Sequence, residues 1–451
     1  EAFRNLDVDY IMSSPGSVWS PVWEAMARQT VEKNDGPTFL DCWHETVAVD
    51  MAIGYTAYTG RPQAVMIHAG VGLMHGSMAM LTAAQNEIPM VVMSGESTTF
   101  GADPEIDVEP QWYGGVSVGG ANKFVAPIVK WSAHVSSAPT LYNSITRACE
   151  MSQRVPQGPV YLNISLEAML HPWSKPADLK RVRPAPKLQP QPQDVEEVAA
   201  LLRSAKRPAV VTEASGRDPA AYHALVELAE TLAVPVMNGR ASFYTNFPRN
   251  HPMWMGYDFS PLEQCDLVLL VGGKAPWYPP HKRFGKGRIV AISENPLRPQ
   301  LAYQDTGAEI FLEGDIAASL ALLTAAAKAG SDARLIEERR NHWTVAHNKL
   351  IASLEADQKK SLEGEGMDCI AMAAVAAQVL PKDAIVCDET ITHMPQMRPH
   401  LNLDAPQSFF RLGGGALGQG IGQTLGTKLA AKDRPVVLFV GDGTFLYNPI
   451  I

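Results

Sequence analysis

Residues 436–444 read VVLFVGDGT, five apolar residues followed directly by Gly441, Asp442, Gly443 and Thr444. The apolar run predicts a buried strand that delivers the Gly-Asp-Gly triplet into a turn. Glycines let the backbone approach a diphosphate closely, and the aspartate between them can bind a hard cation that bridges two phosphate oxygens. The stretch therefore predicts a metal and diphosphate site at the end of a buried strand, with an ordinary turn as the alternative.

Strand-sized apolar runs recur along the rest of the chain, ending in glycine or polar turns and followed by helix-length segments. This alternation is typical of parallel strands joined by crossover helices. Because parallel α/β sheets bind ligands at the carboxyl ends of their strands, the residues directly after these runs are the candidate site residues. We expect strands at residues 63–67, 90–93, 208–212, 267–271, 288–292 and 384–387, with a helix over residues 73–85.

The domain organisation follows from length and proline content. A chain of 451 residues is too long for one hydrophobic core and, at about 150 residues a domain, should form about three. The clearest linker is the proline-rich segment 174–194, because proline at that density excludes regular helix and central strand. We expect three parallel-sheet α/β domains, at residues 1–173, 195–330 and 331–451.

Bulk composition excludes several classes of protein. Hydrophobic residues make up 46% and charged residues 19%, as in ordinary globular proteins. The net charge of −9 and the absence of a long basic run argue against a nucleic-acid partner. The longest apolar runs are far shorter than the ~20 residues of a membrane helix. The five cysteines form no CxxC pair, which fits reduced thiols and a cytoplasmic location.

Two further stretches contain candidate chemistry. The glycine-rich segment 413–422 invites close approach of a ligand or of another backbone, but it is not the GxGxxG pattern of a dinucleotide site. In segment 41–55, Glu45 opens a helix whose inner face is small and apolar. A carboxylate in apolar surroundings is typical of a general acid, whereas at a helix start it can simply interact favourably with the macrodipole.

The order of these three features resembles the thiamine diphosphate enzymes of the acetolactate synthase and benzoylformate decarboxylase group. The resemblance runs through all three blocks and implies a pyrimidine-binding domain, a central Rossmann-like domain and an incomplete diphosphate-binding domain. It also implies thiamine diphosphate and Mg²⁺ as cofactors, and a homodimer or homotetramer with active sites between subunits. Further matches are SPGS at residues 14–17, the segment 85–95, VPQGPVYL at 155–162 and KRP at 206–208.

The resemblance also assigns roles to individual residues. Glu45 matches the glutamate that hydrogen-bonds the aminopyrimidine ring and activates the cofactor. Gly415 would offer a carbonyl to the exocyclic amine, Leu417 would support the bent cofactor from below, and Asp442 matches the first magnesium ligand. The other expected cofactor contacts are Pro15, Thr390, Thr392, Gly441, Gly443 and Thr444.

On the substrate side, two positions resemble benzoylformate decarboxylase more than acetolactate synthase. His68 follows the strand at residues 63–67 and could protonate the substrate or hold its carboxylate, and Ser17 could bind that carboxylate. The alternatives are a structural histidine and a helix-capping serine. His281 is a further candidate for the pocket, and a role for His393 stays open. We expect the remaining histidines, His44 and His75 among them, to be structural or exposed.

Two departures from the family pattern affect the expected cofactors. The central block lacks the Gly-Met-His-Gly signature of FAD-containing acetolactate synthases, so FAD is not expected. The family's magnesium motif continues to an asparagine farther along than residue 451, and Asn448 lies too close to Asp442 to replace it. We therefore expect this sequence to lack the second metal ligand.

The resulting hypothesis is a lyase or transferase that decarboxylates a 2-oxo acid, or transfers its acyl-anion equivalent, with Glu45, His68 and Ser17 as catalytic residues. One alternative uses the same cofactor to cleave a 1,2-diketone or an acyloin. Another is a catalytically inactive regulatory protein on the same fold. A third is an oxidoreductase that binds a nucleotide in the central block.

Overall fold

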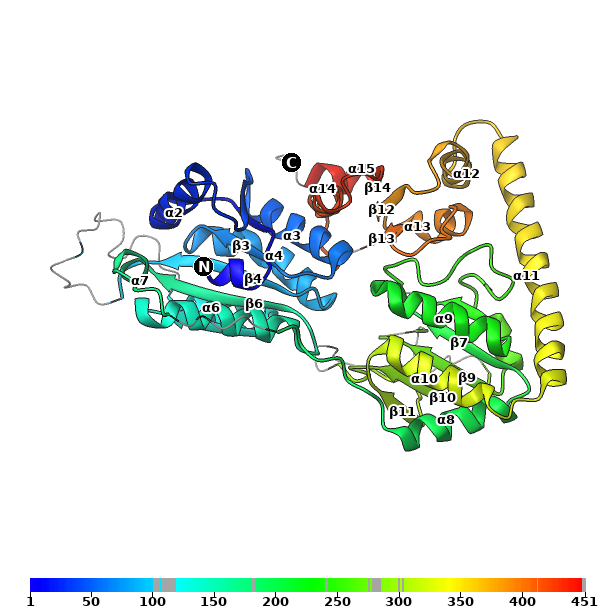
Figure 1. The fold of residues 1–451 in the computed structure, drawn as a ribbon. Helices are drawn as coiled ribbons and strands as arrows, with labels where there is room; N and C mark the ends of the chain where they lie inside the picture. The colour runs from blue at the N-terminus through cyan, green and yellow to red at the C-terminus, as the bar shows by residue number, and fades with distance from the viewer. Residues whose placement is uncertain are drawn as a thin grey trace. The chain divides into compact units, whose positions relative to one another are not determined.

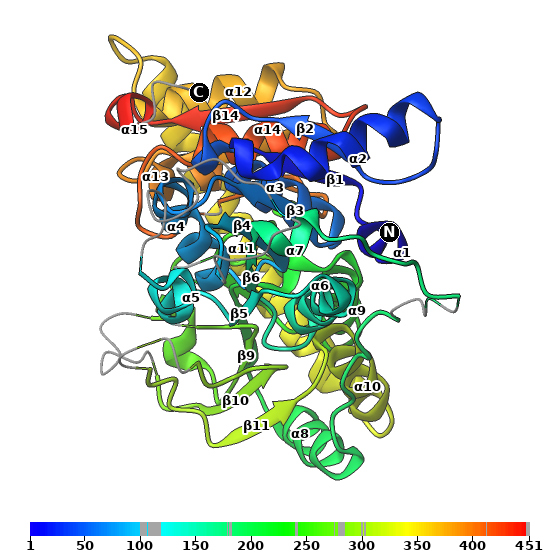
Figure 2. The ribbon, with the colours of Figure 1, turned by 90° about the vertical axis from the view of Figure 1, so that its left-hand side faces the viewer.

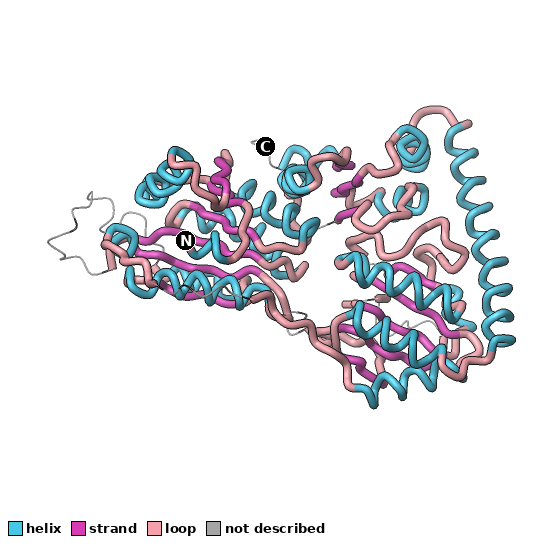
Figure 3. Tube along the Cα trace, viewed as in Figure 1, coloured by secondary structure: helices cyan, strands magenta, loops and turns pink. Residues whose placement is uncertain are grey.

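The computed structural model of this protein contains two compact units, residues 1–186 with 412–451 and residues 187–411. In each unit, helices cover the strands (Figures 1 and 3). The finer division into three domains stays a prediction. The structure describes residues 1–99, 106, 119–177, 179, 183–239, 242–274, 276–277, 285–298, 301, 304–411 and 413–447.

The first unit is built on a six-stranded, all-parallel sheet of order β2-β1-β3-β4-β6-β5. Its central strands are buried on both faces, which explains why they read as unbroken apolar runs. The strand predicted at residues 63–67 is confirmed, and the one predicted at 90–93 extends to Glu96. The strands are β1 (Tyr10–Ser13), β2 (Thr38–Asp41), β3 (Gln63–Ile67), β4 (Met90–Glu96), β5 (Trp131–Val135) and β6 (Pro159–Ser165).

Two helices of this unit matter most for the site, because they leave the sheet after β2 and β3. The helix α3 (Glu45–Thr59) follows β2, and α4 (Val71–Gln85) follows β3 and begins two residues before the predicted start. The other elements are α1 (Ala2–Asn5), η1 (Ser17–Trp19), α2 (Ser20–Val31), α5 (Ala121–Val125), η3 (Ala126–Ile128), α6 (Ala138–Gln153), α7 (Leu166–Leu170), α14 (Gly420–Ala430), β14 (Val436–Val440) and α15 (Asp442–Tyr447).

The C-terminal segment joins the first unit through close packing of α14 along α3 (Figure 2). A Cβ atom on Gly54 would overlap the carbonyl of Gln423, and one on Gly426 would overlap the carbonyl of Met51. The amide Nε2 of Gln423 also donates to Oδ1 of the fully buried Asp50 at 3.3 Å. Glycines therefore let the two helix backbones approach more closely than any other residue would allow.

The second unit contains a five-stranded parallel sheet of order β11-β10-β9-β7-β8 and a separate parallel pair, β12 with β13. The strands predicted at residues 208–212 and 267–271 are confirmed, whereas β10 and β12 differ from their predicted ends by one or two residues. The strands are β7 (Pro208–Thr212), β8 (Val236–Asn238), β9 (Leu267–Val271), β10 (Arg288–Ser293), β11 (Ile310–Glu313), β12 (Ile385–Glu389) and β13 (Phe409–Phe410).

The 30-residue helix α11 is tied to the sheet region of the second unit by one buried cation. The guanidinium of Arg339 donates to the carbonyls of Leu202, Ala205 and Leu232, which end the helices α8 and α9. These carbonyls would otherwise be buried without partners. The helical elements are α8 (Pro192–Ser204), η4 (Ser215–Arg217), α9 (Pro219–Leu232), η5 (Ser260–Gln264), α10 (Ile316–Lys328), α11 (Ala333–Leu362), α12 (Cys369–Val379), α13 (Met394–Met397) and η6 (Arg398–His400).

Among the described residues, every helix is either too short or too polar to cross a bilayer.

Candidate active site

The predicted catalytic residues of the first unit lie along one edge of its sheet. Strand β1 has β2 on one side and β3 on the other, so the connections leave in opposite directions and create a crevice at the carboxyl ends. The segment 15–17 follows β1, Glu45 follows β2 and His68 follows β3. The topology therefore brings Pro15, Ser17, Glu45 and His68 to the edge where a parallel sheet binds its ligand.

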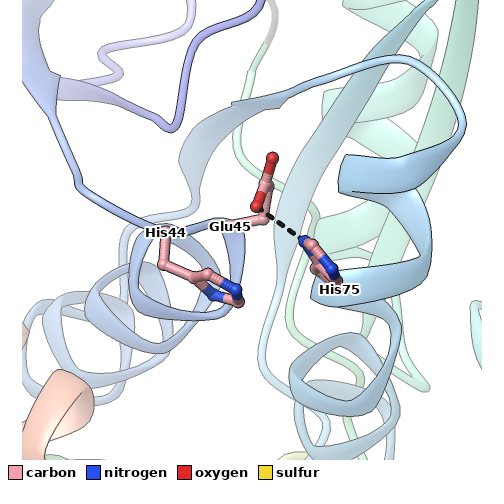
Figure 4. Close-up of side chains that lie close together, drawn as sticks. All are labelled: His44, Glu45 and His75. Carbon is pink, nitrogen blue, oxygen red and sulfur yellow. Dashed lines mark hydrogen bonds and ion pairs between the residues drawn. The ribbon is translucent and has the colours of Figure 1, made fainter. Parts of the chain in front are cut away.

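Glu45 is a buried carboxylate with one partner that reaches the surface (Figure 4). It is the first residue of α3, and its side chain is only 11% exposed. Its Oε2 lies 3.2 Å from Nδ1 of His75, on the first turns of α4, and the side chain of His75 is 56% exposed. Its Oε1 lies against Gly72, since a Cβ atom there would be 2.7 Å from that oxygen.

His44 completes a group of three side chains around Glu45. Its imidazole stacks on that of His75, with ring centroids 4.8 Å apart and planes at 25°. It also caps α3, because Nδ1 accepts a hydrogen bond from the backbone N–H of Thr46 at 3.2 Å. The hydroxyl of Thr46 in turn donates to the carbonyl of His75 at 2.9 Å. Sequence reasoning missed this cluster, although both histidines belong to segments that leave the same sheet edge.

Gly72 makes the close approach of Glu45 and His68 possible. A Cβ atom at this position would lie 2.7 Å from Oε1 of Glu45 and 2.8 Å from Cβ of His68. Real Cβ atoms almost never approach other atoms this closely, so any larger residue would displace one of the two side chains. The glycine therefore lets the carboxylate of Glu45 and the base of the His68 side chain both pack against the first turn of α4.

His68 has a buried nitrogen that lacks a protein partner. Among the described residues, nothing hydrogen-bonds its Nδ1, although that atom is buried. The ring lies against Gly16, where a Cβ atom would overlap Nδ1. The loop that carries Gly16 is fixed by Trp19, whose indole N–H donates to the carbonyl of Ile67 at 2.8 Å. A buried polar atom without a partner is costly, and a ligand is one explanation for it.

The two other predicted residues of this loop are at the surface. Pro15 and Ser17 are exposed, and Ser17 is the first residue of η1 rather than its cap, which is Gly16. Nearby, burial raises the pKa of the Cys42 thiol to about 11, so this cysteine is not a nucleophile at neutral pH.

The glycine-rich segment lies against the far end of α4. A Cβ atom on Gly414 would be 2.5 Å from the hydroxyl oxygen of Thr82, and Asn86 donates to the carbonyl of Gly413 at 3.5 Å. Thr82 is seven residues beyond His75, which corresponds to ~10 Å along the helix. Gly415 is exposed with open space where a side chain would be, and Leu417 is partly buried.

The Gly-Asp-Gly triplet follows the strand predicted at residues 436–440, which is confirmed as β14. Asp442 and Gly443 are exposed, whereas the side chain of Thr444 is buried. A Cβ atom on Gly443 would have nothing within 4 Å, and Oδ1 of Asp442 accepts the Gly443 N–H at 2.8 Å. The geometry is an accessible carboxylate next to open backbone, which suits a hard cation and a phosphate.

The predicted phosphate contacts Thr390 and Thr392, together with His393, belong to the second unit. The hydroxyl of Thr390 donates to Oδ1 of the buried Asp388 at 2.6 Å, and burial raises the pKa of Asp388. Thr392 and His393 are exposed in the turn after β12. They lie at the carboxyl end of that strand, as expected for ligand contacts. His281 falls outside the described residues.

The second unit has an equivalent switch point, between β7 and β9. Glu213 follows β7 and is 1% exposed. Its Oε2 accepts a hydrogen bond from the backbone N–H of Lys274, and Gly239 lies against its side chain. The carboxyl group at this switch point is therefore engaged by the backbone of its own unit.

Comparisons with known proteins agree with the arrangement of these segments. Residues 1–109, 195–323 and 392–450 match the N-terminal, central and C-terminal domain models of the thiamine pyrophosphate enzymes, respectively. The chain belongs to this family. The predicted family and fold class are thus confirmed, and the first and last of these models are thiamine pyrophosphate-binding domains.

Curated relatives within the thiamine pyrophosphate enzymes have several activities. Acetolactate synthase large subunit IlvG of Mycobacterium tuberculosis is 28% identical over 435 residues, covering 92% of this chain and 73% of the relative. Benzoylformate decarboxylase of Pseudomonas aeruginosa is 25% identical over 424 residues, covering 90% and 74%. Sulfoacetaldehyde acetyltransferase of Castellaniella defragrans is 24% identical over 435 residues, covering 89% and 70%. The family thus includes synthases, decarboxylases and acetyltransferases.

Solved structures confirm the fold. Benzoylformate decarboxylase from Polynucleobacter necessarius superimposes with a TM-score of 0.77 at 22% identity, covering 99% of this chain and 80% of that structure. The 4-hydroxybenzoylformate decarboxylase of Rhodococcus jostii gives a TM-score of 0.78 at 22% identity, with the same coverage.

Proposed function

We propose that this thiamine pyrophosphate enzyme acts on a 2-oxo acid, either decarboxylating it or transferring its acyl-anion equivalent to a second carbonyl compound. The observation that carries the proposal is the pair formed by Glu45 and His68 at the crevice between β1 and β3. Gly72 lies against both the carboxylate of Glu45 and Cβ of His68, whose imidazole has a buried nitrogen without a partner among the described residues. A group that holds the cofactor and a group that moves a proton are the two that such a reaction needs.

The residues present suit thiamine diphosphate. Oε1 of Glu45 would meet a ring nitrogen of the aminopyrimidine, with Pro15, Gly415 and Leu417 as further contacts of that part. When bound, the cofactor supplies the nucleophilic carbon and the electron sink for cleavage beside a carbonyl. The diphosphate contacts would be Thr390, Thr392, Gly441, Gly443 and Thr444.

Mg²⁺ would bind Asp442, because an exposed carboxylate between two glycines offers the oxygen ligand that a hard cation prefers. In this proposal Asp442 supplies one ligand and the diphosphate supplies others.

His68 and Ser17 would act on the substrate. His68 would hold or deliver a proton through Nδ1, the atom that is buried without a partner among the described residues. Ser17 has an exposed hydroxyl on the loop after β1 and would bind the substrate carboxylate. Because His68 and Ser17 would contact the substrate and not the cofactor, they could also determine which 2-oxo acid is accepted.

Exposed apolar side chains support the proposed homo-oligomer. Trp43, Val71, Met74 and Met78 flank the Glu45 group on α4 and on the loop before α3, and Trp43 is 91% exposed. Large apolar side chains gathered near a site are typical of a surface that another chain covers. We propose that a second copy of this protein covers it, as a homodimer or as part of a homotetramer. The five free cysteines support the proposed cytoplasmic location.

A substrate panel on the full-length protein tests the reaction. With thiamine diphosphate and Mg²⁺ added, pyruvate or benzoylformate should yield carbon dioxide together with an aldehyde or a new carbon–carbon bond. Cleavage of acetoin or of a 1,2-diketone, with no reaction on 2-oxo acids, would favour the alternative lyase. Absence of any thermal stabilisation by the two cofactors would refute the proposal and favour an inactive regulatory protein.

A further inference from the structure

The carboxylate of Glu45 is held by His75, a side chain that is neither a proposed catalytic residue nor a proposed cofactor contact. Oε2 of Glu45 lies 3.2 Å from Nδ1 of His75, while Oε1 faces Gly72, where a Cβ atom would lie 2.7 Å away. We propose that His75 is a positioning residue: its Nδ1–H donates to Oε2 and thereby presents Oε1 to the cofactor. The inference rests on the proposed function, since it assigns Glu45 the task of contacting thiamine diphosphate.

The hydrogen bonds around the two histidines define the tautomers that the proposal requires. An ionised carboxylate only accepts hydrogen bonds, so the proton between Oε2 of Glu45 and His75 belongs to Nδ1 of His75. His44 has the opposite arrangement, because its Nδ1 accepts the N–H of Thr46 and its Nε2 must therefore carry the proton. The proposal therefore requires Nδ1 to be the donor in His75 and Nδ1 to be the acceptor in His44.

The surroundings of His75 restrict its movement although it is exposed. Its ring stacks on that of His44, which is itself fixed as the cap of α3. Its backbone carbonyl accepts the hydroxyl of Thr46 at 2.9 Å. These contacts join the starts of α3 and α4, so the direction from which His75 meets the carboxylate is set by the packing of the two helices.

The same three side chains could instead be ligands of a transition metal. The candidate ligand atoms of His44, Glu45 and His75 lie within 4.8 Å of one another. A metal requires a free lone pair from each ligand. The hydrogen bond from Thr46 uses the lone pair of Nδ1 in His44, and Nδ1 of His75 is engaged with Oε2 of Glu45. A metal bound through either Nδ1 would have to break that hydrogen bond, which favours the positioning role, and a metal titration tests binding through the Nε2 atoms.

Nuclear magnetic resonance of histidine-labelled protein tests the hydrogen bond without the cofactor. Long-range ¹H–¹⁵N correlations, assigned to His75 by the loss of its signals in His75→Asn, should show that Nδ1 carries a proton. Protonation on Nε2 alone would overturn the proposal. Because this result needs neither substrate nor cofactor, it remains informative if the proposed function fails.

Kinetics and cofactor affinity test the consequence for Glu45. His75→Ala should lower kcat by about 10- to 100-fold, the usual effect of losing a hydrogen bond to a charged group, and leave the substrate KM unchanged. It should weaken thiamine diphosphate binding, measured by fluorescence quenching, by less than about tenfold. His75→Asn keeps a donor N–H near the position of Nδ1 and should restore kcat to within about threefold of wild type.

A matched control is available on the same sheet. His134 is exposed on β5, and His134→Ala should leave kcat, KM and the cofactor affinity unchanged. Equal activity of His75→Ala and wild type would overturn the proposal, and so would failure of His75→Asn to restore activity. If wild type itself binds no thiamine diphosphate, the proposed function fails and the tautomer experiment alone decides the role of His75.

A metal titration tests whether His44, Glu45 and His75 bind a metal instead. Co²⁺ added to the protein in the absence of both cofactors should produce no intense visible absorption band that depends on His44 and His75. Such a band in wild type, lost in both His44→Ala and His75→Ala, would show a metal site and overturn the positioning role.

Discussion

The two units place a glutamate at equivalent crevices and use it differently. In the first unit β1 lies between β2 and β3, and in the second β7 lies between β8 and β9, so both sheets have a switch point beside their first strand. Glu213 at the second switch point accepts a backbone N–H and is sealed by its own chain. Glu45 is instead held by the side chain of His75, which itself reaches the surface.

The difference shows that topology creates a crevice but the local partners decide whether a ligand can use it. A carboxylate bound to its own backbone is satisfied and buried, and its main effect is structural. A carboxylate held on one oxygen by a side chain keeps its other oxygen for a ligand. The predictions below test this contrast between the two units.

The largest effect is expected from removing the charge of Glu45. Glu45→Gln should lower turnover by about 10²- to 10⁴-fold, the range for a positioned acid or base, with little change in melting temperature. Glu213→Gln, the matched change at the other switch point, should leave kcat within about twofold of wild type. Steady-state kinetics and calorimetry of both variants make the comparison. Comparable turnover losses in the two variants would show that Glu45 has no special role in catalysis compared with Glu213.

His68→Ala should have the next largest effect, a loss of about 10²-fold in kcat on 2-oxo acids, because a positioned proton donor would be removed. Thiamine diphosphate affinity should stay near that of wild type, since His68 is proposed to act on the substrate. Binding and turnover measured on the same preparation separate the two properties. An unchanged kcat would make His68 a structural residue.

Gly72→Ala should lower kcat by about tenfold, because the new methyl group must displace Glu45 or His68 from its position. Gly158→Ala is the control in the same unit, since a Cβ atom there meets only Lys130 at 3.6 Å, an ordinary contact distance. Kinetics of the two alanine variants should therefore differ. Equal activity would mean that the backbone shifts to accommodate the methyl group, and that Gly72 does not fix the pair.

The smallest effect is expected from a carboxylate at the edge of the second sheet. Burial and then the nearby Asp315 raise the pKa of Glu294 from 4.5 to about 7. The folded state therefore holds this proton more tightly than the unfolded state, and the stability gained from it is present at low pH and lost as pH rises from 4.5 through about 7.

Glu294→Gln should remove this pH dependence and stabilise the protein by about 1–2 kcal/mol at pH 8 relative to wild type, because the neutral amide has no charge to desolvate and none to repel Asp315. Melting temperatures between pH 4 and 8 provide the measurement, with the exposed Glu365→Gln as control. Parallel curves for wild type and Glu294→Gln would show that Glu294 has an ordinary pKa.

The sequence predicted the interior strands better than the marginal ones. Strands β3, β7 and β9 match their predicted limits because a strand covered on both faces must be apolar throughout. Strand β14 also matches its predicted limits, but the prediction that it is buried was wrong, since all five of its residues are partly exposed. By contrast, no residue of β2 is fully buried, and β13 has only two residues, so neither forms an apolar run. Their pairing comes from tertiary contacts that a local pattern does not contain.

The site shows the same division. His68 was selected because it follows the predicted strand at residues 63–67, and Glu45 because it opens a helix with an apolar inner face and matches the family resemblance. The contact between Glu45 and His75 was not predicted, because it depends on how closely α3 and α4 approach at Gly72. Such distances arise from packing between segments far apart in sequence, and a single sequence does not state them.

The packing of α14 on α3 has a consequence for how the chain folds during synthesis. Asp50 and its partner Gln423 are 373 residues apart, and the whole second unit lies between them in the sequence. A ribosome adding about 5–20 residues per second leaves α3 without this partner for roughly 20–75 s after it emerges. During that interval the face of α3 that carries Asp50 and Gly54 is open to other chains, so misassembly of nascent molecules at this helix becomes possible.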